Sequence, residues 1–338
     1  MKKKAKKTSA GRRGSGTRLI VLAVAAVGLA AGAAVFLRDH GKPTGGHGER
    51  PPLRIALPPP PPQAPPPVAE LPPAPPAAST AAVAPPPRGP EAPAWKRFAA
   101  HAPAADARPL IAIVIDDMGI DRKRSSRAVA LQAPLTLSWL PYGQDIGRQA
   151  AAARAAGHEI LLHLPMQPDG RENPGPNALT VDLGADEIRR RVDADLALLP
   201  EAVGLNNHMG SRFTRDAQAM APVIDEVKRR GMLFLDSRTS AASIAADVAR
   251  EAGVPHAERD VFLDNEATVD AVRARLAEIE AIARRRGVAV AIGHPHDATL
   301  EALEPWLRSL AGRGFVLVPI SAAVQYRLDH PAQTAARG

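Results

Sequence analysis

The sequence predicts an α/β domain built as a closed or nearly closed barrel of parallel strands, and two observations lead to this fold class. From Pro109 onward, short apolar runs alternate with longer runs of helical pattern, which is typical of parallel strands joined by helical crossovers. Seven or eight such units in about 220 residues suit a β/α barrel. A doubly wound open sheet is the alternative, although no glycine-rich phosphate loop follows the first strand, which disfavours its dinucleotide-binding version.

The first strand is the clearest element. It is expected at 110–115, an unbroken apolar run typical of a strand buried on both faces. Further strands are expected at 135–140, 159–164, 203–207, 232–236, 256–263 (a weaker run), 288–293 and 315–320. Helices are expected at 122–132, 145–156, 185–199, 216–230, 243–252, 268–286 and 299–310, and several are followed by a capping glycine. The segment 165–184, with several Pro, Gly and Asn residues, is expected to be a long loop.

The residues before the barrel predict a membrane anchor and a spacer. Residues 1–18 carry eight basic residues and no acidic one, and residues 19–37 carry no charge. At 1.5 Å per residue that apolar run is about 28 Å long as a helix, which matches a hydrocarbon core. We expect an uncleaved transmembrane helix at 19–37 with its N-terminus in the cytoplasm; a cleaved signal peptide is the alternative, and either exports the rest of the chain.

Residues 38–108 predict a disordered spacer rich in proline and alanine. Twenty of the 35 prolines lie between Pro51 and Pro103, and proline runs favour extended polyproline II over a packed core. The expected organisation is therefore a cytoplasmic tail at 1–18, an inner-membrane anchor at 19–37, the spacer, a periplasmic barrel at 109–328 and a flexible tail at 329–338.

Charge and cysteine content exclude several classes of function. The net charge is +8, but eight of the 43 basic residues lie in the first eighteen positions, and the other 35 balance 35 acidic residues. The bulk of the chain therefore does not indicate binding to nucleic acid. The absence of cysteine excludes disulfides, thiolate catalysis, cysteine-ligated zinc and iron–sulfur clusters.

Polar residues of ligand type follow the expected strands, where the carboxyl ends of parallel strands form an active-site rim. Two adjacent carboxylates after a buried strand repel each other unless a cation lies between them. Oxygen and imidazole ligands without sulfur suit a divalent metal, most simply a catalytic zinc, which activates water, while a carboxylate and a histidine serve as base and acid. These are the parts needed to hydrolyse an amide or an ester. The residues at the expected rim are Asp116, Asp117, His163, Asn206, Asn207, His208, Asp236, Ser237, Arg238, Asp260, Asp264, Asn265, His294 and His296.

Six stretches resemble the polysaccharide deacetylase superfamily, and most closely its divergent branch. The resemblance implies a distorted β/α barrel and metal-dependent removal of N- or O-acetyl groups from sugars. The stretches are IAIVIDDMG (111–119), GHEILLHLPMQP (157–168), GLNNHMGSRFT (204–214), FLDSRTS (234–240), RDVFLDN (259–265) and IGHPH (292–296).

The resemblance implies roles for individual residues. Asp116 corresponds to the catalytic base, Asp117 and His163 to metal ligands, and His294 to the general acid, with His296 as a competitor. The family's second metal-binding histidine is replaced here by Gln167, so His208 is predicted as the third ligand; a structural polar network with Asn206 and Asn207 is its alternative. The candidates for binding or orienting substrate are Gln167, Asn207, Asp236, Arg238 and Trp139, where Trp139 and Tyr142 either stack on a sugar ring or belong to the core.

The expected function is that of a metal-dependent carbohydrate deacetylase of the cell envelope, acting on an acetylated glycan. One alternative is a deacetylase-fold domain that has lost turnover and binds glycan or an envelope protein. Another is a hydrolase of a different ester or a phosphodiester. The oligomeric state is not predicted.

Overall fold

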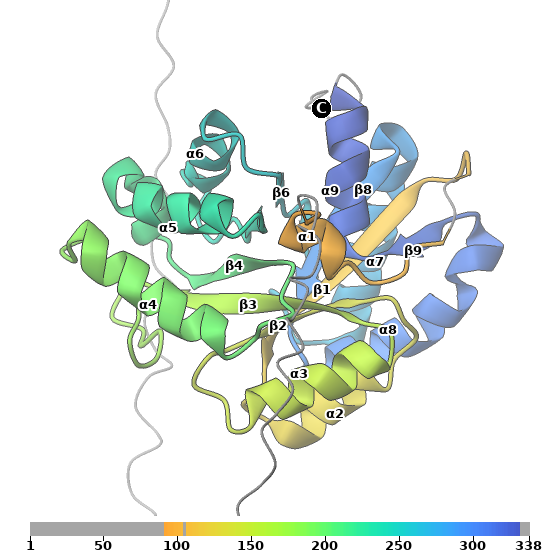
Figure 1. The fold of residues 1–338 in the computed structure, drawn as a ribbon. Coiled ribbons are helices and arrows are strands. Elements are labelled where there is room, and N and C mark those ends of the chain that lie inside the picture. The colour runs from red at the N-terminus through yellow and green to blue at the C-terminus, as the bar shows by residue number, and fades with distance from the viewer. Residues whose placement is uncertain (1–90, 104–105, 332–338) are drawn as a thin grey trace, which may run out of the picture. The chain divides into compact units, whose positions relative to one another are not determined.

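A single parallel sheet of nine strands organises residues 91–103 and 106–331, which the computed structural model describes (Figure 1). The cytoplasmic tail, the membrane anchor and most of the spacer predicted above lie outside the described residues, as do residues 332–338 of the predicted C-terminal tail. Within the described ranges, none of the helices has the length and apolar character needed to span a membrane.

The observed elements follow the predicted order closely. Strands are β1 (Leu110–Met118), β2 (Thr136–Trp139), β3 (Glu159–Met166), β4 (Gly204–Met209), β5 (Leu233–Asp236), β6 (His256–Glu258), β7 (Val261–Phe262), β8 (Val288–Gly293) and β9 (Val316–Val318). Helices are α1 (Ala94–Arg97), α2 (Arg122–Val129), α3 (Ile146–Ala155), α4 (Ala185–Ala197), α5 (Ala217–Arg229), α6 (Ala245–Glu251), α7 (Val269–Arg286), α8 (Asp297–Leu310) and α9 (Ile320–Asp329). Two helices, α1 and α9, were not predicted, and the single weak strand predicted at 256–263 is in fact two strands.

The sheet confirms a parallel α/β architecture curled toward a barrel. Its strand order is β6-β5-β4-β3-β2-β1-β8-β7, and every pair is parallel. The two edge strands, β6 and β7, are consecutive in the chain, and no ladder joins them within the described residues. Strand β9 pairs with Leu110–Ala112, the first residues of β1, whereas β2 pairs with β1 only from Val114 onward. The barrel is therefore incompletely closed.

Alternation of side chains along the strands creates two apolar layers. Val114 of β1, Leu161 of β3 and Ile292 of β8 belong to the layer inside the curled sheet. Their neighbours Ile113 and Leu162 belong to the layer beneath the outer helices. Because successive strand residues point to opposite faces, the inward residues two positions further along β1, β3 and β8 reach the carboxyl-terminal mouth of the barrel.

The amino-terminal end of the barrel is filled by the two helices that the sequence did not predict. Ile320 and Val324 of α9, together with Trp95 of α1, complete the inner apolar layer. The backbone N–H of Ile320 donates to Oγ1 of Thr136 at the start of β2, and that of Trp95 donates to the carbonyl of Gly231 just before β5.

Glu159, the first residue of β3, is a fully buried acid at this closed end. Its carboxyl group accepts hydrogen bonds from the Ser321 hydroxyl at 2.5 Å, the Ser321 N–H at 2.9 Å and the Ala100 N–H at 3.1 Å. Burial raises the pKa of Glu159 to about 7, and these hydrogen bonds offset part of the rise. Glu159 thereby ties α9 and the segment after α1 to the sheet.

Candidate metal and catalytic site

The end of β1 supplies two adjacent carboxylates to the mouth of the barrel. Asp116 continues the inward series of Val114 and is 2% exposed. Simple alternation would turn Asp117 outward, but its φ of 56° places it in the left-handed region, and the register between β1 and β2 shifts between Ile115 and Met118. This local break lets both carboxylates face the same site, at the expense of backbone strain of the kind that concentrates at functional sites.

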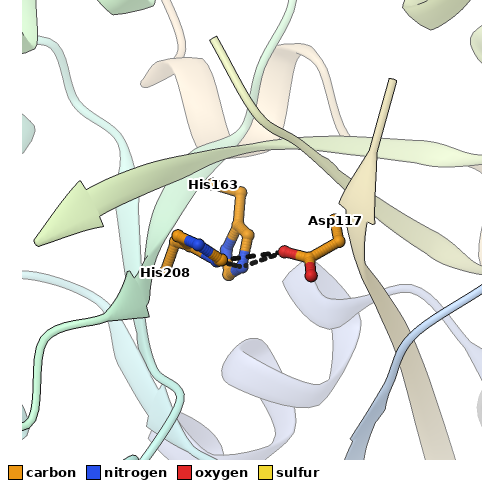
Figure 2. A group of neighbouring side chains, drawn as sticks. All are labelled: Asp117, His163 and His208. Carbon is orange, nitrogen blue, oxygen red and sulfur yellow. Dashed lines mark hydrogen bonds and ion pairs between the residues drawn. The ribbon is translucent and has the colours of Figure 1, made fainter. Parts of the chain in front are cut away.

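Asp117, His163 and His208 converge from β1, β3 and β4, as the sequence predicted (Figure 2). Oδ1 of Asp117 lies 3.3 Å from Nε2 of His163 and 3.0 Å from Nδ1 of His208. The two imidazole nitrogens are 3.1 Å apart. The three atoms thus form a compact triangle with sides of 3.0 to 3.3 Å.

This triangle has the dimensions and chemistry of a divalent-metal site. With bonds of about 2.0–2.1 Å, ligands of a tetrahedral zinc lie about 3.3 Å from one another. No group in the described part of the chain donates a hydrogen bond to Oδ1 of Asp117, although that oxygen is buried. A buried carboxylate oxygen without a donor calls for a cation, and two imidazoles with one carboxylate form a common zinc set.

The pKa directions at the cluster agree with an anionic Asp117. Although burial opposes ionisation, the adjacent imidazoles of His163 and His208 hold the pKa of Asp117 far below its usual range. Burial would lower the pKa of His163, but Asp116 and Asp117 outweigh it and raise that pKa. A bound cation competes with the imidazole protons for the same nitrogens, so metal binding is favoured as pH rises.

Asp116 lies beside the cluster in the position of a general base. Its Oδ2 is 3.6 Å from Nε2 of His163, and both of its oxygens accept from Nδ2 of Asn206, at 2.9 and 3.1 Å. Burial raises the pKa of Asp116, while the nearby His163 and His294 offset part of the effect. A carboxylate with a raised pKa is better suited to accepting a proton than an exposed one.

His294, at the end of β8, is held by Asp264 and directed toward Asp117. Nδ1 of His294 lies 3.0 Å from Oδ1 of Asp264, and Nε2 lies 3.9 Å from Oδ2 of Asp117. Burial would lower the pKa of His294, but Asp264, with Asp117 and Asp116, raises it to about 9. The imidazole is therefore protonated at neutral pH in the metal-free protein. His296 is exposed beside it, with ring centroids 5.6 Å apart, so His294 is the better placed acid.

The side chains of Trp139, Asn207 and Asp236, three of the predicted substrate contacts, are completely buried in the structure, and their contact with substrate stays a prediction. Alternation explains this burial, since each lies one position away from an inward-facing residue. Trp139 packs in the outer core. Asn207 accepts from the Ser237 N–H and donates to the Met209 carbonyl.

Asp236 accepts from the Ser243 hydroxyl and the Arg238 N–H, and so shapes the turn after β5. Arg238 itself pairs with Glu258 at 2.7 Å. Gln167 is half-buried, and its side-chain oxygen accepts from the Val181 N–H. It thereby holds the loop between β3 and α4. Substrate contact by Arg238 and Gln167 stays a prediction.

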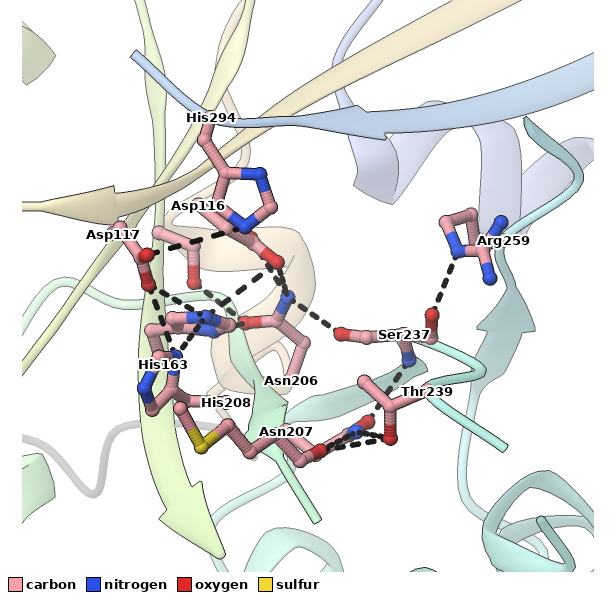
Figure 3. A network of polar contacts seen from close by, with 12 residues as sticks. Asp116, Asp117, His163, Asn206, Asn207, His208, Ser237, Thr239, Arg259 and His294 are labelled. Atoms are coloured by element: carbon pink, nitrogen blue, oxygen red, sulfur yellow. Dashed lines mark hydrogen bonds and ion pairs between the residues drawn. The ribbon is translucent and has the colours of Figure 1, made fainter. Parts of the chain in front are cut away.

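Two residues predicted at the rim, Asn206 of β4 and Ser237 after β5, join Asp116 and His163 in one polar network (Figure 3). Ser138 of β2, which the sequence analysis did not single out, donates to the same asparagine. Arg259 donates to the Ser237 carbonyl at 2.7 Å. The signal that could have found this network is alternation along the strands. Counting in steps of two from the inner-layer residues Ala112, Leu161 and Leu235 leads to Asp116, His163 and Ser237.

Comparisons with known proteins agree with this geometry. Residues 113–324 match the family described as divergent polysaccharide deacetylase, a range that includes every residue of the site. The uncharacterized protein YibQ of Escherichia coli K12 is 35% identical over 200 residues, which cover 59% of this chain and 63% of that protein, less than two thirds of its length. An uncharacterized protein of Haemophilus influenzae is 33% identical over 204 residues, covering 60% of this chain and 73% of the other.

A solved structure shares the same fold. The crystal structure of the uncharacterized protein ATU2773 from Agrobacterium tumefaciens C58 has 32% sequence identity and a TM-score of 0.66, covering 68% of this chain and 94% of the other. The family match covers more than half of the chain and confirms the resemblance seen in the sequence motifs. The chain belongs to the divergent polysaccharide deacetylase family.

Proposed function

We propose that the protein is a metal-dependent hydrolase that removes acetyl groups from a glycan of the cell envelope. The observation that carries the proposal is the triangle of Asp117, His163 and His208, with a buried carboxylate oxygen that lacks a hydrogen-bond donor among the described residues. Asp116 and His294 lie beside this triangle in positions suited to a base and an acid. Membership of a deacetylase family makes an acetylated sugar the simplest substrate.

Asp117, His163 and His208 would hold the ion, most simply zinc. When bound there, a divalent ion supplies Lewis acidity that polarises a carbonyl and lowers the pKa of water toward neutrality. Asp116 accepts the proton of the attacking water, and its two contacts with Asn206 hold the carboxylate in place. His294, held through Nδ1 by Asp264, donates the Nε2 proton to the leaving amine or alcohol of the sugar.

The cellular setting is a separate part of the proposal. The basic residues of 1–18 and the uncharged apolar run of 19–37 favour an inner-membrane anchor with the barrel on the periplasmic side. The proline-rich residues that follow would act as the spacer. Such an arrangement gives the barrel access to envelope glycans.

A second candidate is a barrel that binds glycan or an envelope protein without turnover. It is motivated by Gln167, which stands where the sequence resemblance expects a ligand histidine. However, Gln167 is engaged with the Val181 N–H, and His208 from the next strand completes the triangle. A set of three ligands is therefore available without position 167, which favours the enzyme.

Metal content and acetate release from one preparation test the proposal. The purified protein should hold one divalent ion per chain by elemental analysis and should release acetate from at least one member of a panel of acetylated glycans. Asp117→Ala and His163→Ala should lose both properties, whereas Glu159→Gln, which alters a buried acid at the other end of the barrel, should keep both. Full activity in the Asp117→Ala/His163→Ala double variant would refute the enzyme. Metal-free protein that binds glycan with unchanged affinity but releases no acetate would favour the second candidate.

A further inference from the structure

Asn206 lies between the metal triangle and the base, and it uses its whole hydrogen-bonding capacity (Figure 3). Its side chain is completely buried. Oδ1 accepts from the Ser138 hydroxyl at 2.5 Å and lies 2.9 Å from Nδ1 of His163. Nδ2 donates to the Asp116 carboxylate and to Oγ of Ser237, the latter at 3.0 Å. An asparagine amide offers two acceptor and two donor positions, and all four are occupied here.

The surroundings allow only one orientation of this amide. Turning it by 180° would set its oxygen against the oxygens of Asp116, which, in the ionised form that a base requires, have no hydrogen to donate. The same turn would direct its NH₂ group at the hydroxyl and ring nitrogen that now donate to Oδ1. Since a buried polar group without a partner is unfavourable, Asp116 determines which way the amide faces.

The orientation of the amide in turn determines the state of His163. Because Oδ1 can only accept, Nδ1 of His163 must carry the hydrogen. A neutral His163 then presents the lone pair of Nε2 to the triangle, which is the form that a metal requires. A single side chain thus connects the charge of Asp116 with the ligand tautomer of His163.

We infer that Asn206 is a positioning residue that couples the metal ligand His163 to the base Asp116. Its amide oxygen accepts from His163, and its amide nitrogen donates to Asp116. The part that concerns Asp116 rests on the proposed hydrolase, whereas the part that concerns His163 does not, because metal affinity is measured without turnover. A purely structural role predicts that all substitutions at position 206 affect metal binding and turnover together.

Two substitutions separate the two halves of the amide. Asn206→Asp keeps an acceptor for His163 and Ser138 but removes the donor to Asp116. Asn206→Leu has a similar size and removes both. Ser138→Ala is the matched control, since it removes one contact to the same amide oxygen without touching His163 or Asp116.

Zinc affinity, measured on the purified full-length chain by competition with a chelator, and the kcat and KM of acetate release are the readouts. Asn206→Leu should weaken zinc binding by about 10–100-fold, the usual effect of removing a partner that orients a ligand. Asn206→Asp should bind zinc at least as tightly as the wild type and lose about 100-fold or more in kcat, with little change in KM. Ser138→Ala should change each quantity less than about threefold.

A double-mutant cycle that combines Asn206→Asp with Asp116→Asn tests whether Asn206 acts through the base Asp116. In the Asp116→Asn background, Asn206→Asp should cost no further kcat, because the group it positions is already absent. Wild-type zinc affinity in Asn206→Leu, or wild-type kcat in Asn206→Asp, would overturn the inference. If the wild type releases no acetate, the proposed hydrolase fails, but the expected difference in zinc affinity between Asn206→Leu and Asn206→Asp still decides the ligand half. If Asn206→Leu does not fold, weakened zinc binding by Asn206→Asp would itself contradict the inference, and tight binding would support it.

Discussion

Each end of the barrel holds a carboxylate with a buried oxygen, but the surroundings of the two carboxylates differ. At the amino-terminal end, Glu159 accepts three hydrogen bonds from Ser321 and Ala100. At the carboxyl-terminal mouth, Oδ1 of Asp117 accepts none from any described residue and faces two imidazole nitrogens instead. The backbone differs as well, because Asp117 has a positive φ, whereas Glu159 lies in a regular parallel pairing with Thr136.

This contrast separates structural acids from ligand acids within one domain. The hydrogen bonds that Glu159 accepts offset part of the cost of burying its carboxyl group, so this acid needs no cation. A buried carboxylate oxygen without a hydrogen-bond donor, next to other ligand atoms, is stabilised by a cation or a proton between them. Burial alone therefore does not identify a metal site. The distinguishing feature is a buried carboxylate oxygen that lacks a hydrogen-bond donor among the described residues.

The largest expected effect is on metal binding at the mouth. Asp117→Asn should weaken zinc affinity by more than about 1,000-fold, because losing a ligand costs more than the roughly 10–100-fold effect of losing a partner that orients one. The free energy of unfolding of the metal-free form should change by at most about 1 kcal/mol, since the side chain is 35% exposed. Calorimetric zinc titration and chemical denaturation in chelator provide the two values. Zinc affinity within tenfold of the wild type would remove Asp117 from the ligand set.

Glu159→Ala should show the reverse pattern. It leaves two backbone N–H groups and a hydroxyl without their acceptor at the closed end, so the free energy of unfolding should fall by about 3–5 kcal/mol. Zinc affinity should stay within about twofold of the wild type, because the triangle lies at the other end of the barrel. If Glu159→Ala were as stable as the wild type but bound zinc more weakly, Glu159 would not be a purely structural acid, and the contrast between the two ends would be wrong.

The same acid should produce a measurable pH dependence of stability. Its pKa is about 7 in the folded protein against 4.5 in the unfolded chain, so the folded state binds this proton more tightly. The contribution is fully present below about pH 4.5 and is lost as pH rises through 7, with a total of up to about 3 kcal/mol. The wild-type minus Glu159→Gln difference in unfolding free energy, measured from pH 4 to 8, isolates it. A difference that is flat, or that rises with pH, would contradict the raised pKa.

A smaller effect is expected from replacing Asp264, which lies at the mouth of the barrel but has hydrogen-bond donors for both of its carboxylate oxygens. It accepts from His294 Nδ1, the His294 N–H and the Thr299 hydroxyl. Asp264→Asn should lower kcat of acetate release by about 10–100-fold, because His294 loses the group that orients it, and should leave zinc affinity within about threefold. A kcat equal to that of the wild type would exclude His294 as an acid positioned by Asp264.

Strand ends were readable from the sequence because apolar runs and their terminal residues are local features. Asp117, His163 and His208 accordingly meet as predicted. The face of each terminal residue was harder to read, since it depends on strand register and on breaks such as the left-handed Asp117. Trp139 and Asp236 illustrate this, because both lie at predicted strand ends but are buried one position away from an inward-facing residue.

Longer-range closure of the barrel was not readable from local pattern. Helix α9 follows β9 after a single residue, and its Ile320 fits the inner apolar layer, so the run 315–320 looked like one strand. The role of Asn206 depends on partners that are 90 and 43 residues away in the chain, Asp116 and His163. Such a network appears only when the strands are placed side by side.

The location of a bound ion is the most direct test of the central claim. Crystals of the protein soaked in zinc and measured at the zinc absorption edge should show one strong anomalous peak within bonding distance of Asp117 Oδ1, His163 Nε2 and His208 Nδ1. The Glu159 end should show none. An empty triangle at saturating zinc, or a strong peak only at other residues, would contradict the account.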